Sequence, residues 1–306
     1  MCLKVPIGVP PATKQIAVCS NCCMSPSSSA ASSRRILFLF LAVMAVKPSP
    51  LFRPAADPET TPDQLVREVM HHEIQAELNE TNLWSYRDLT ERHGQQVLLE
   101  YCQTKYGTIH RLLAVNGRPL GPRQRQAEDE RIQKLIESPN AIQESQKKEA
   151  ADAREERKFL ELLPDAFRYQ NEGEQGDLVT LKFAPNPAFH PSGYEAQALC
   201  HLQGTTVLDV KQKRLVRING RLTTRVNFWG GLLGHLNQGG TFSVVSEQVA
   251  PGDWELKALD VQMSGKALFF KTIAIRESDT YTDYRLVPPE TTLEQAAEQL
   301  KKDSGG

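Results

Sequence analysis

The sequence lacks the residue patterns by which enzymes are usually recognised. It contains no G-x-S-x-G, no phosphate-binding loop, no H-E-x-x-H and no G-x-G-x-x-G after a predicted strand. Its seven histidines are scattered, and none forms with an acid a pattern typical of a general base. Asp279 and Asp283 are interpreted as exposed strand-end acids, not as a catalytic carboxylate pair. We therefore expect no enzymatic activity, no catalytic residues, no metal and no cofactor. A catalytic site assembled only in space is the alternative.

The sequence also has no strong net charge, and its cysteines are not evenly spread. The formal net charge is −1, and basic residues do not gather with aromatic ones on one strand face, so we expect no nucleic-acid partner. Four of the six cysteines lie in the first 23 residues, where Cys19 and Cys22 have C-x-x-C spacing but no second pair to complete a zinc site. In the body of the chain, Cys102 and Cys200 either form one disulfide or remain two ordinary thiols.

Long apolar runs are absent, apart from one short run near the N-terminus. Arg34-Arg35 precedes eleven apolar residues, 36–46, a length typical of a signal peptide and too short to span a bilayer comfortably. We predict a signal peptide and spacer over 24–56, a periplasmic location and a mature protein that is not integral to the membrane. An uncleaved anchor at 36–46 is the alternative. Because Met24 opens a leader of ordinary length, residues 1–23 are interpreted as a mis-assigned extension.

What the chain does contain is a long stretch of alternating strands, 204–287. Within 214–224, for example, Val216, Ile218 and Leu222 fall on one face and polar residues on the other, the period of two that a half-buried strand needs.

Turn residues divide this stretch into six predicted strands. Pro251-Gly252-Asp253 and Ser264-Gly265-Lys266 predict tight turns, and Gly230-Gly231 predicts a flexible turn in preference to a phosphate cradle. The short connections favour an up-and-down antiparallel meander. A meander this wide must curl or close, because a long open edge pairs with other chains, so we predict a half-closed barrel.

Helix and strand signals also flank this stretch. Thr60 or Thr61 as N-cap, Pro62 at the first helical position and an acidic first turn predict a helix over 62–78. On it, His71-His72-Glu73 is interpreted as a solvated patch. The tail, 289–306, is expected to form a short helix or to fray. Further strands are predicted at 84–93, 95–105, 108–115, 167–174 and 178–185.

Residues 122–164 differ in kind from the strands around them. The segment is dense in charge and poor in β-branched residues, and its apolar residues gather at the end, at Phe159, Leu160, Leu162 and Leu163. We predict a helical hairpin or lid that docks through its last turns and is solvated elsewhere. A partner-binding coiled coil is the alternative, although sustained heptads are absent.

One face of the predicted sheet is apolar enough to line a cavity. An apolar ligand between a half-barrel and covering helices is one interpretation of this face, and a filled core is the other. The candidate lining residues are Val216, Ile218, Leu222, Phe228, Leu259, Val261, Met263, Phe269 and Ile273.

Several short segments resemble the outer-membrane lipoprotein-sorting (LolA-like) family, in particular an uncharacterised bacterial subset. They are Thr61-Pro-Asp-Gln-Leu65, Asn116-Gly-Arg-Pro-Leu120, Phe183-Ala-Pro-Asn-Pro-Ala-Phe189, Leu208-Asp-Val-Lys-Gln-Lys-Arg-Leu-Val216 and Gly230-Gly-Leu-Leu233. The resemblance implies an α+β fold over 57–288: an incomplete, half-open antiparallel β-barrel covered by helices, with acyl chains held inside. The helical insert at 122–164 departs from the family pattern, and the family's functional arginine matches no single arginine here.

The resulting expectation is an exported carrier that shelters the acyl chain of a lipid or lipoprotein. The alternative is an envelope-stress or regulatory binding module on the same fold, which docks an envelope protein partner through 122–164.

Overall fold

The computed structural model describes residues 61–303, except for 93, 229–232 and 268–270. The predicted N-terminal extension, the signal peptide and spacer, Gly230-Gly231 and Phe269 lie outside these residues. Among the helices that are described, none is both long and apolar enough to cross a membrane.

The described chain is an α+β protein built on one open antiparallel sheet of 13 strands. The order is β4-β3-β2-β1-β13-β12-β11-β8-β7-β6-β5, with β9 and β10 attached beside β12. Because β4 and β5 end this order without pairing with each other, the sheet does not close. In chain order the strands are β1 (Leu83–Arg92), β2 (Gln95–Thr104), β3 (Gly107–Val115), β4 (Arg118–Pro119), β5 (Phe167–Gln175), β6 (Leu178–Pro185), β7 (Leu202–Asp209), β8 (Arg214–Leu222), β9 (Val226–Phe228), β10 (Gly234–Leu236), β11 (Thr241–Ala250), β12 (Asp253–Ala267) and β13 (Lys271–Val287).

The predicted turn at 264–266 is wrong, because β12 continues through it to Ala267. Two strands were also predicted at 267–277 and 281–287, whereas β13 runs unbroken from Lys271 to Val287. Gly265 pairs with Ile273 of β13 on one side and with Leu236 of β10 on the other, and an added Cβ would be 2.0 Å from the carbonyl oxygen of His235. The glycine therefore permits close approach of another strand and does not mark a turn.

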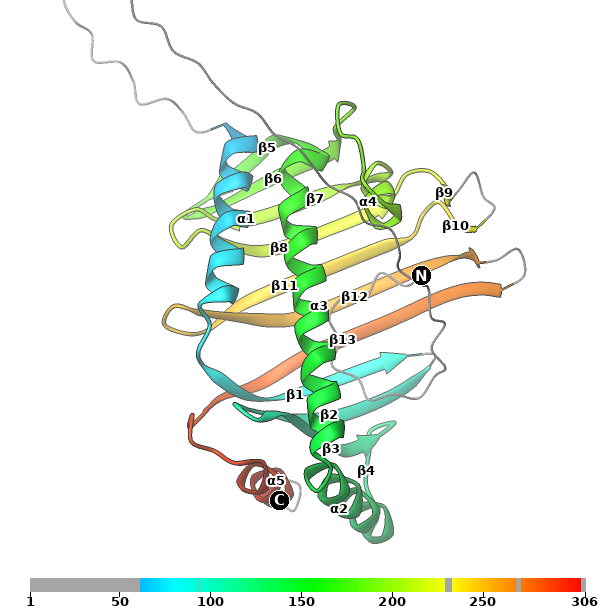
Figure 1. The fold of residues 1–306 in the computed structure, drawn as a ribbon. Coiled ribbons are helices and arrows are strands. Elements are labelled where there is room, and N and C mark those ends of the chain that lie inside the picture. The colour runs from blue at the N-terminus through cyan, green and yellow to red at the C-terminus, as the bar shows by residue number, and fades with distance from the viewer. Residues whose placement is uncertain (1–60, 93, 229–232, 268–270, 304–306) are drawn as a thin grey trace, which may run out of the picture. The chain divides into compact units, whose positions relative to one another are not determined.

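Helix α1 (Pro62–Leu78) forms with the predicted bounds. Thr61 is its N-cap: the hydroxyl accepts from the backbone N–H of Gln64, and the Gln64 side chain accepts from the backbone N–H of Thr61. This capping box satisfies two donors that a helix start would leave unpaired. The helix buries Val66, Val69 and Met70 and packs on β8 and β5 (Figure 1).

The charge-dense insert forms two helices, α2 (Pro122–Ile136) and α3 (Pro139–Ala166). It docks through its last turns as predicted, with Leu163 and Ala166 buried, but Ile142 near the start of α3 is buried as well. Helix α3 contacts β3 at one side of the sheet and β5 at the other, while most of its side chains between 143 and 158 are exposed. Figure 1 shows this helix running across the strands.

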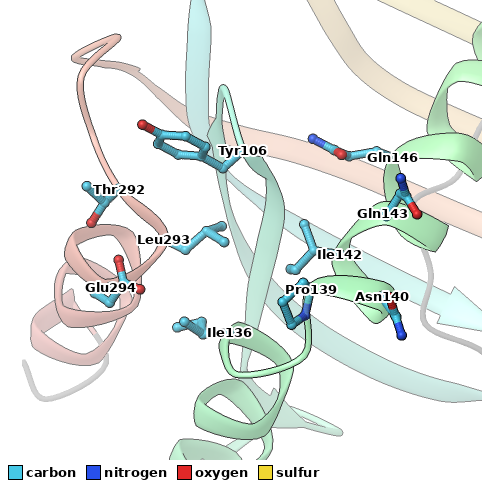
Figure 2. A pocket seen from close by; sticks show the side chains of 10 residues that line it. All are labelled: Tyr106, Ile136, Pro139, Asn140, Ile142, Gln143, Gln146, Thr292, Leu293 and Glu294. Atoms are coloured by element: carbon cyan, nitrogen blue, oxygen red, sulfur yellow. The ribbon is translucent and has the colours of Figure 1, made fainter.

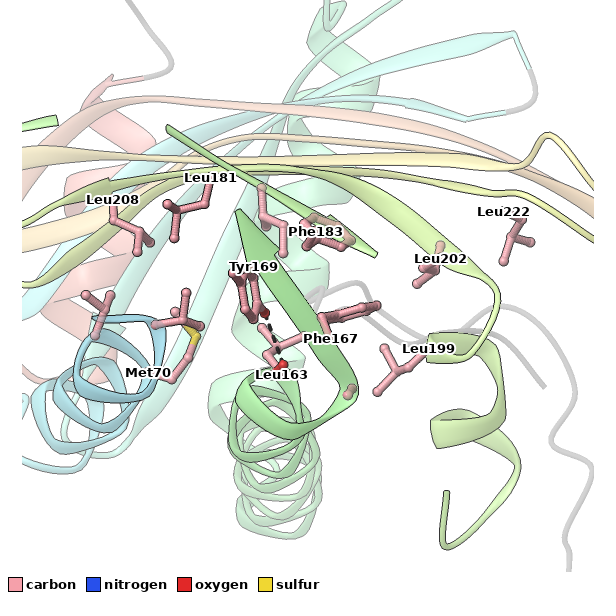
Figure 3. Packing of buried hydrophobic residues seen from close by; sticks show 14 of the residues in the cluster. Met70, Leu163, Phe167, Tyr169, Leu181, Phe183, Leu199, Leu202, Leu208 and Leu222 are labelled. Atoms are coloured by element: carbon pink, nitrogen blue, oxygen red, sulfur yellow. Dashed lines mark hydrogen bonds between the residues drawn. The ribbon is translucent and has the colours of Figure 1, made fainter. Parts of the chain in front are cut away.

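The main core lies between α1, the end of α3 and the strands from β5 to β12. Figure 3 shows part of it, including Met70 of α1, Leu163 of α3 and the paired strands around Phe167 and Phe183. The hydroxyl of Tyr169 donates to the backbone carbonyl of Leu163 at 3.0 Å, which ties β5 to the last turns of α3.

A second, smaller core forms where the tail returns to the sheet. Helix α5 (Leu293–Asp303) buries Ala296 and Leu300 against β2 and β3, beside Ile109 and Ile142. Of the two alternatives for the tail, the chain adopts the helix. The remaining short helix, α4 (Tyr194–Leu199), precedes β7.

Helix side chains occupy part of the two outer edges of the sheet. At β3, Glu128 accepts from the N–H of Leu112 at 2.8 Å, and Arg131 donates to the carbonyl of His110 at 2.6 Å. At β5, Asp63 of α1 accepts from the N–H of Tyr169 at 3.0 Å. These bonds satisfy edge groups that would otherwise be free to pair with another chain.

Candidate functional site

An apolar stripe crosses the middle of the sheet on the face that carries α1. We define it as Ile218, Leu222, Leu259, Val261 and Met263, each at most 6% exposed. All five were predicted as lining residues, and all belong to the main core together with Val66, Val69 and Met70 of α1.

The stripe is continuous because β11 joins β8 to β12. Val244 pairs with both Ile218 and Leu259, and Phe242 pairs with Val261. Gly220 faces Phe242, and a Cβ there would lie 2.3 Å from its ring. The glycine therefore leaves room for the aromatic side chain on this face.

The other predicted lining residues have different positions. Phe228 is partly buried and packs against the stripe's core. Val216 and Ile273 are half-buried and are not members of that core, whereas Leu215 and Ile275 pack against it. In the structure the stripe residues are buried by their neighbours in the main core.

A β-bulge explains why Leu215, and not the predicted Val216, packs against the main core. In the pairing of β7 with β8, Val207 faces Arg217 and Leu208 faces Leu215, so Val216 is skipped. One extra residue reverses which side chains point to which face. Strict alternation from Ile218 therefore selects Val216 incorrectly.

A polar cluster adjoins the stripe on the same face. Register pairs Leu259 of the stripe with Asp279, and Val261 with Glu277, on the neighbouring strand β13. On β1, the next strand, Thr90 pairs with Asp279 and Arg92 with Glu277. Directly paired residues of an antiparallel sheet share a face, so the sheet changes from apolar to acidic in one strand step.

We define the inner acidic cluster as Asp88, Thr90, Arg92, Glu277 and Asp279. Arg92 bonds to Glu277 and lies 3.8 Å from an Asp279 oxygen, and Thr90 donates to Asp88 at 3.1 Å. Three carboxylates thus share one guanidinium. The cluster carries two more negative than positive charges when its acids are ionised.

Several polar atoms of this cluster have no hydrogen-bond partner among the described residues. They are both carboxylate oxygens of Asp279, one oxygen of Asp88 and Nε of Arg92, and the Asp279 side chain is 0% exposed. Buried polar atoms are nearly always paired, so such an accumulation of unpaired atoms requires an explanation.

Burial and mutual repulsion alter the acidity of the cluster. Burial, reinforced by the charge of Asp279, raises the pKa of Asp88 to about 7. Burial, opposed by Arg92 and reinforced by Asp279, raises the pKa of Glu277 to about 7. Both groups therefore exchange protons near neutral pH, a property often found at functional sites and also in structural networks.

Aromatic rings adjoin the cluster on β1, β2 and β13. Tyr86 stacks on Tyr101 with ring centroids 5.0 Å apart and on Tyr284 at 5.3 Å. Tyr281, which pairs with Asp88 across the strands, contacts Tyr86 edge-on at 6.0 Å. Burial raises the pKa of Tyr281 far above its usual range, so this phenol stays protonated.

The structure corrects the interpretation of Asp279 and Asp283. Asp279 is a fully buried residue within β13, whereas the Asp283 side chain is 55% exposed and pairs with Arg87. Positive φ at Asp283 (58°) accompanies a break in register, so the spacing of four does not place the two acids together. The sequence signal that was overlooked is the alternation of Tyr86, Asp88, Thr90 and Arg92 on one face of β1.

The patch on α1 is only partly solvated. His71 and His72 are exposed as predicted, but Glu73 is not. Its carboxylate lies 3.0 Å from Arg214 and accepts from the backbone N–H of Leu215. Glu73 thus fixes α1 to the start of β8.

The two cysteines of the described chain are free thiols, so they do not form the disulfide that was one alternative. Burial raises the pKa of Cys102 to about 11, and it therefore stays a thiol at neutral pH. Among the described residues, no group of three or more metal-binding side chains is placed to hold a metal ion.

A separate cavity of about 600 Å³ lies where α2, α3 and α5 meet the turn between β2 and β3. Figure 2 shows Ile142 and Leu293 directed toward its interior. Amides and apolar groups dominate the lining, and Glu294 is its one carboxylate, so the lining has no acid–base pair. The lining residues are Tyr106, Ile136, Pro139, Asn140, Ile142, Gln143, Gln146, Thr292, Leu293 and Glu294.

Comparison with known proteins gives one distant similarity. No protein family and no curated protein matches the chain. Among solved structures, it is similar to the crystal structure of a DUF1329 family protein from Desulfovibrio piger, with 10% sequence identity and a TM-score of 0.28, over 79% of this chain and 100% of that chain. A similarity this distant does not indicate a function.

Proposed function

We propose that the protein is an exported carrier that shelters the acyl chain of a lipid or lipoprotein against the apolar stripe. In this proposal the open sheet works as an incomplete barrel, and α1 and α3 lie across its opening. The observation that carries the proposal is the juxtaposition of a continuous apolar stripe and a polar cluster on one sheet face. Such a face is complementary to a ligand with an apolar chain and a polar end.

The energetics of chain burial are sufficient for useful affinity. Each methylene group removed from water contributes about 0.8 kcal/mol, so ten methylenes contribute roughly 8 kcal/mol before the costs of binding. Association itself costs about 4 kcal/mol or more, so a dissociation constant near 1 μM, which needs a net gain of about 8 kcal/mol, requires burial of about fifteen methylenes.

The geometry of α3 supports access to this face. The helix packs near its two ends, against β3 and β5, and most side chains of its middle are exposed. The last turns of α3 also pack against α1, so in this proposal the ligand enters beneath the part of α3 that lies between its contacts with β3 and with α1.

The test is organic extraction of the full chain after purification from the envelope of an expressing bacterium, followed by mass spectrometry. A stoichiometric lipid is expected. Val261→Trp, which adds bulk at the stripe without adding charge, should abolish loading. Val216→Trp, at a half-buried bulge residue outside the core, should retain it. Circular dichroism checks that both variants fold, and an empty wild-type protein that stays empty after incubation with envelope lipids would contradict the proposal.

The second candidate function is an envelope-stress or regulatory module that docks a protein through 122–164. It is favoured by one observation, the exposed charged middle of α3. Reversal of two exposed charges, Lys147→Glu and Arg154→Glu, should then abolish capture of an envelope protein partner. The same double variant should leave lipid loading unchanged if the carrier proposal is correct.

A further inference from the structure

We propose that the inner acidic cluster binds the cationic amino headgroup of the amphiphile whose chain lies on the apolar stripe. This inference rests on the proposed carrier function and specifies the ligand's polar end. The observation that carries it is Asp279, a fully buried carboxylate whose oxygens accept no hydrogen bond among the described residues while Glu277 is ionised, and which lies 3.8 Å from Arg92.

Charge favours a cation over an anion at this position. The three carboxylates exceed the single guanidinium of Arg92 by two charges, and Arg92 is already engaged by Glu277. An anionic headgroup would meet uncompensated repulsion from Asp88 and Asp279. An ammonium group would supply the donors that these oxygens lack.

The shape of the surroundings also suits an organic ammonium group. Tyr281 pairs with Asp88 across the strands and contacts Tyr86 edge-on, and aromatic rings attract cations electrostatically. Thr90 offers its hydroxyl beside the same carboxylate. The described residues place no metal-binding set at the cluster, so the donor arrangement is better suited to an amine than to a metal ion.

The position of the cluster defines the distance between the amine of the ligand and its apolar chain. Asp279 pairs directly with Leu259 of the stripe, and neighbouring strands lie about 4.8 Å apart. An amine bound at Asp279 therefore places the first carbons of its chain on Leu259 and Val261. No spacer between the amine and the chain is required.

The experiment compares three probes that share a twelve-carbon chain: dodecylamine, dodecanol and dodecanoate. Each is titrated calorimetrically into the delipidated protein at pH 8, below its micelle concentration. Dodecylamine is expected to bind about tenfold or more tightly than dodecanol, because hydrogen bonds to charged groups are stronger than neutral ones. Asp279→Asn should remove most of this preference and leave dodecanol affinity unchanged.

Asp283→Asn is the matched control, since it makes the same change on the same strand at an exposed position. Asp88→Asn gives a second variant with the expected effect, and circular dichroism checks folding. Equal affinity for the amine and the alcohol, preference for dodecanoate, or full displacement of dodecylamine by Ca²⁺ would overturn the headgroup inference and leave the carrier intact. Failure of all three probes to bind would overturn both proposals.

Discussion

Replacement of Asp88 by asparagine should stabilise the protein at alkaline pH and have little effect at acidic pH. Asp88 is 1% exposed, and its pKa is raised from 3.8 to about 7. Between these values the folded protein binds a proton that the unfolded chain has released. The free energy of unfolding therefore falls as pH rises from about 4 to about 7, and it stays low above that range.

The expected gain in the free energy of unfolding follows from the size of the pKa shift of Asp88. One pKa unit corresponds to about 1.4 kcal/mol, so a shift of about three units gives on the order of 4 kcal/mol as an upper limit. Asparagine has nearly the same shape, and its side-chain oxygen can accept from Thr90 as the Asp88 carboxylate does. The substitution thus removes the charge and keeps the hydrogen bond.

The assay is urea unfolding of wild type, Asp88→Asn and the control Asp283→Asn at pH 5, 6, 7 and 8. The Asp88 variant should be more stable than wild type by roughly 2–4 kcal/mol at pH 8, with the difference falling to about 1–2 kcal/mol at pH 5. The control should follow wild type throughout. The free energy of unfolding of the variant will still fall with rising pH, because Glu277 and Glu255 also have pKa values raised to about 7. A difference that is constant with pH, or largest at pH 5, would refute the burial argument.

Two further predictions concern how the helices are held. Glu73→Ala should lower the free energy of unfolding by about 2–4 kcal/mol in urea titrations, because Arg214 and the backbone N–H of Leu215 both lose their carboxylate partner. Gly107→Ala should lower Tm more than Gly117→Ala: both glycines have positive φ (135° and 70°), but an added Cβ at Gly107 lies 3.1 Å from Ile142, whereas Gly117 faces open space. Equal Tm losses at the two glycines would argue against close packing of α3 on β3.

Elements whose signals are local could be predicted from the sequence. The capping box at Thr61 and the apolar spacing along α1 were sufficient for its bounds, and β6 also formed as predicted over 178–185. The insert was recognised as two helices from composition and from Pro139 between them. In each case residues within a few positions of one another determine the conformation.

Features that depend on distant strands could not be predicted in this way. Gly265 resembles a turn residue until β10 is seen to pair with β12 beside it, and Val216 belongs to the apolar face only if the strand has no bulge. The acidic cluster is the strongest example. Asp88 and Asp279 meet only because β1 pairs with β13 in one register, which no short pattern in the sequence encodes.

The open form of the sheet follows from the insert that the sequence singled out. Helix α3 contacts the sheet at Ile142, beside β3, and at its end beside β5, a span of roughly 36 Å at about 1.5 Å per residue. The sheet order places nine strand intervals between β3 and β5, which extend about 43 Å when flat. Closure of the sheet would require the two ends to approach within about 5 Å, which a rigid helix of this length prevents. The expected half-closed barrel is thus an open, modestly bowed sheet, because α3 acts as a strut between its two sides and keeps the face with the stripe and the cluster from closing on itself.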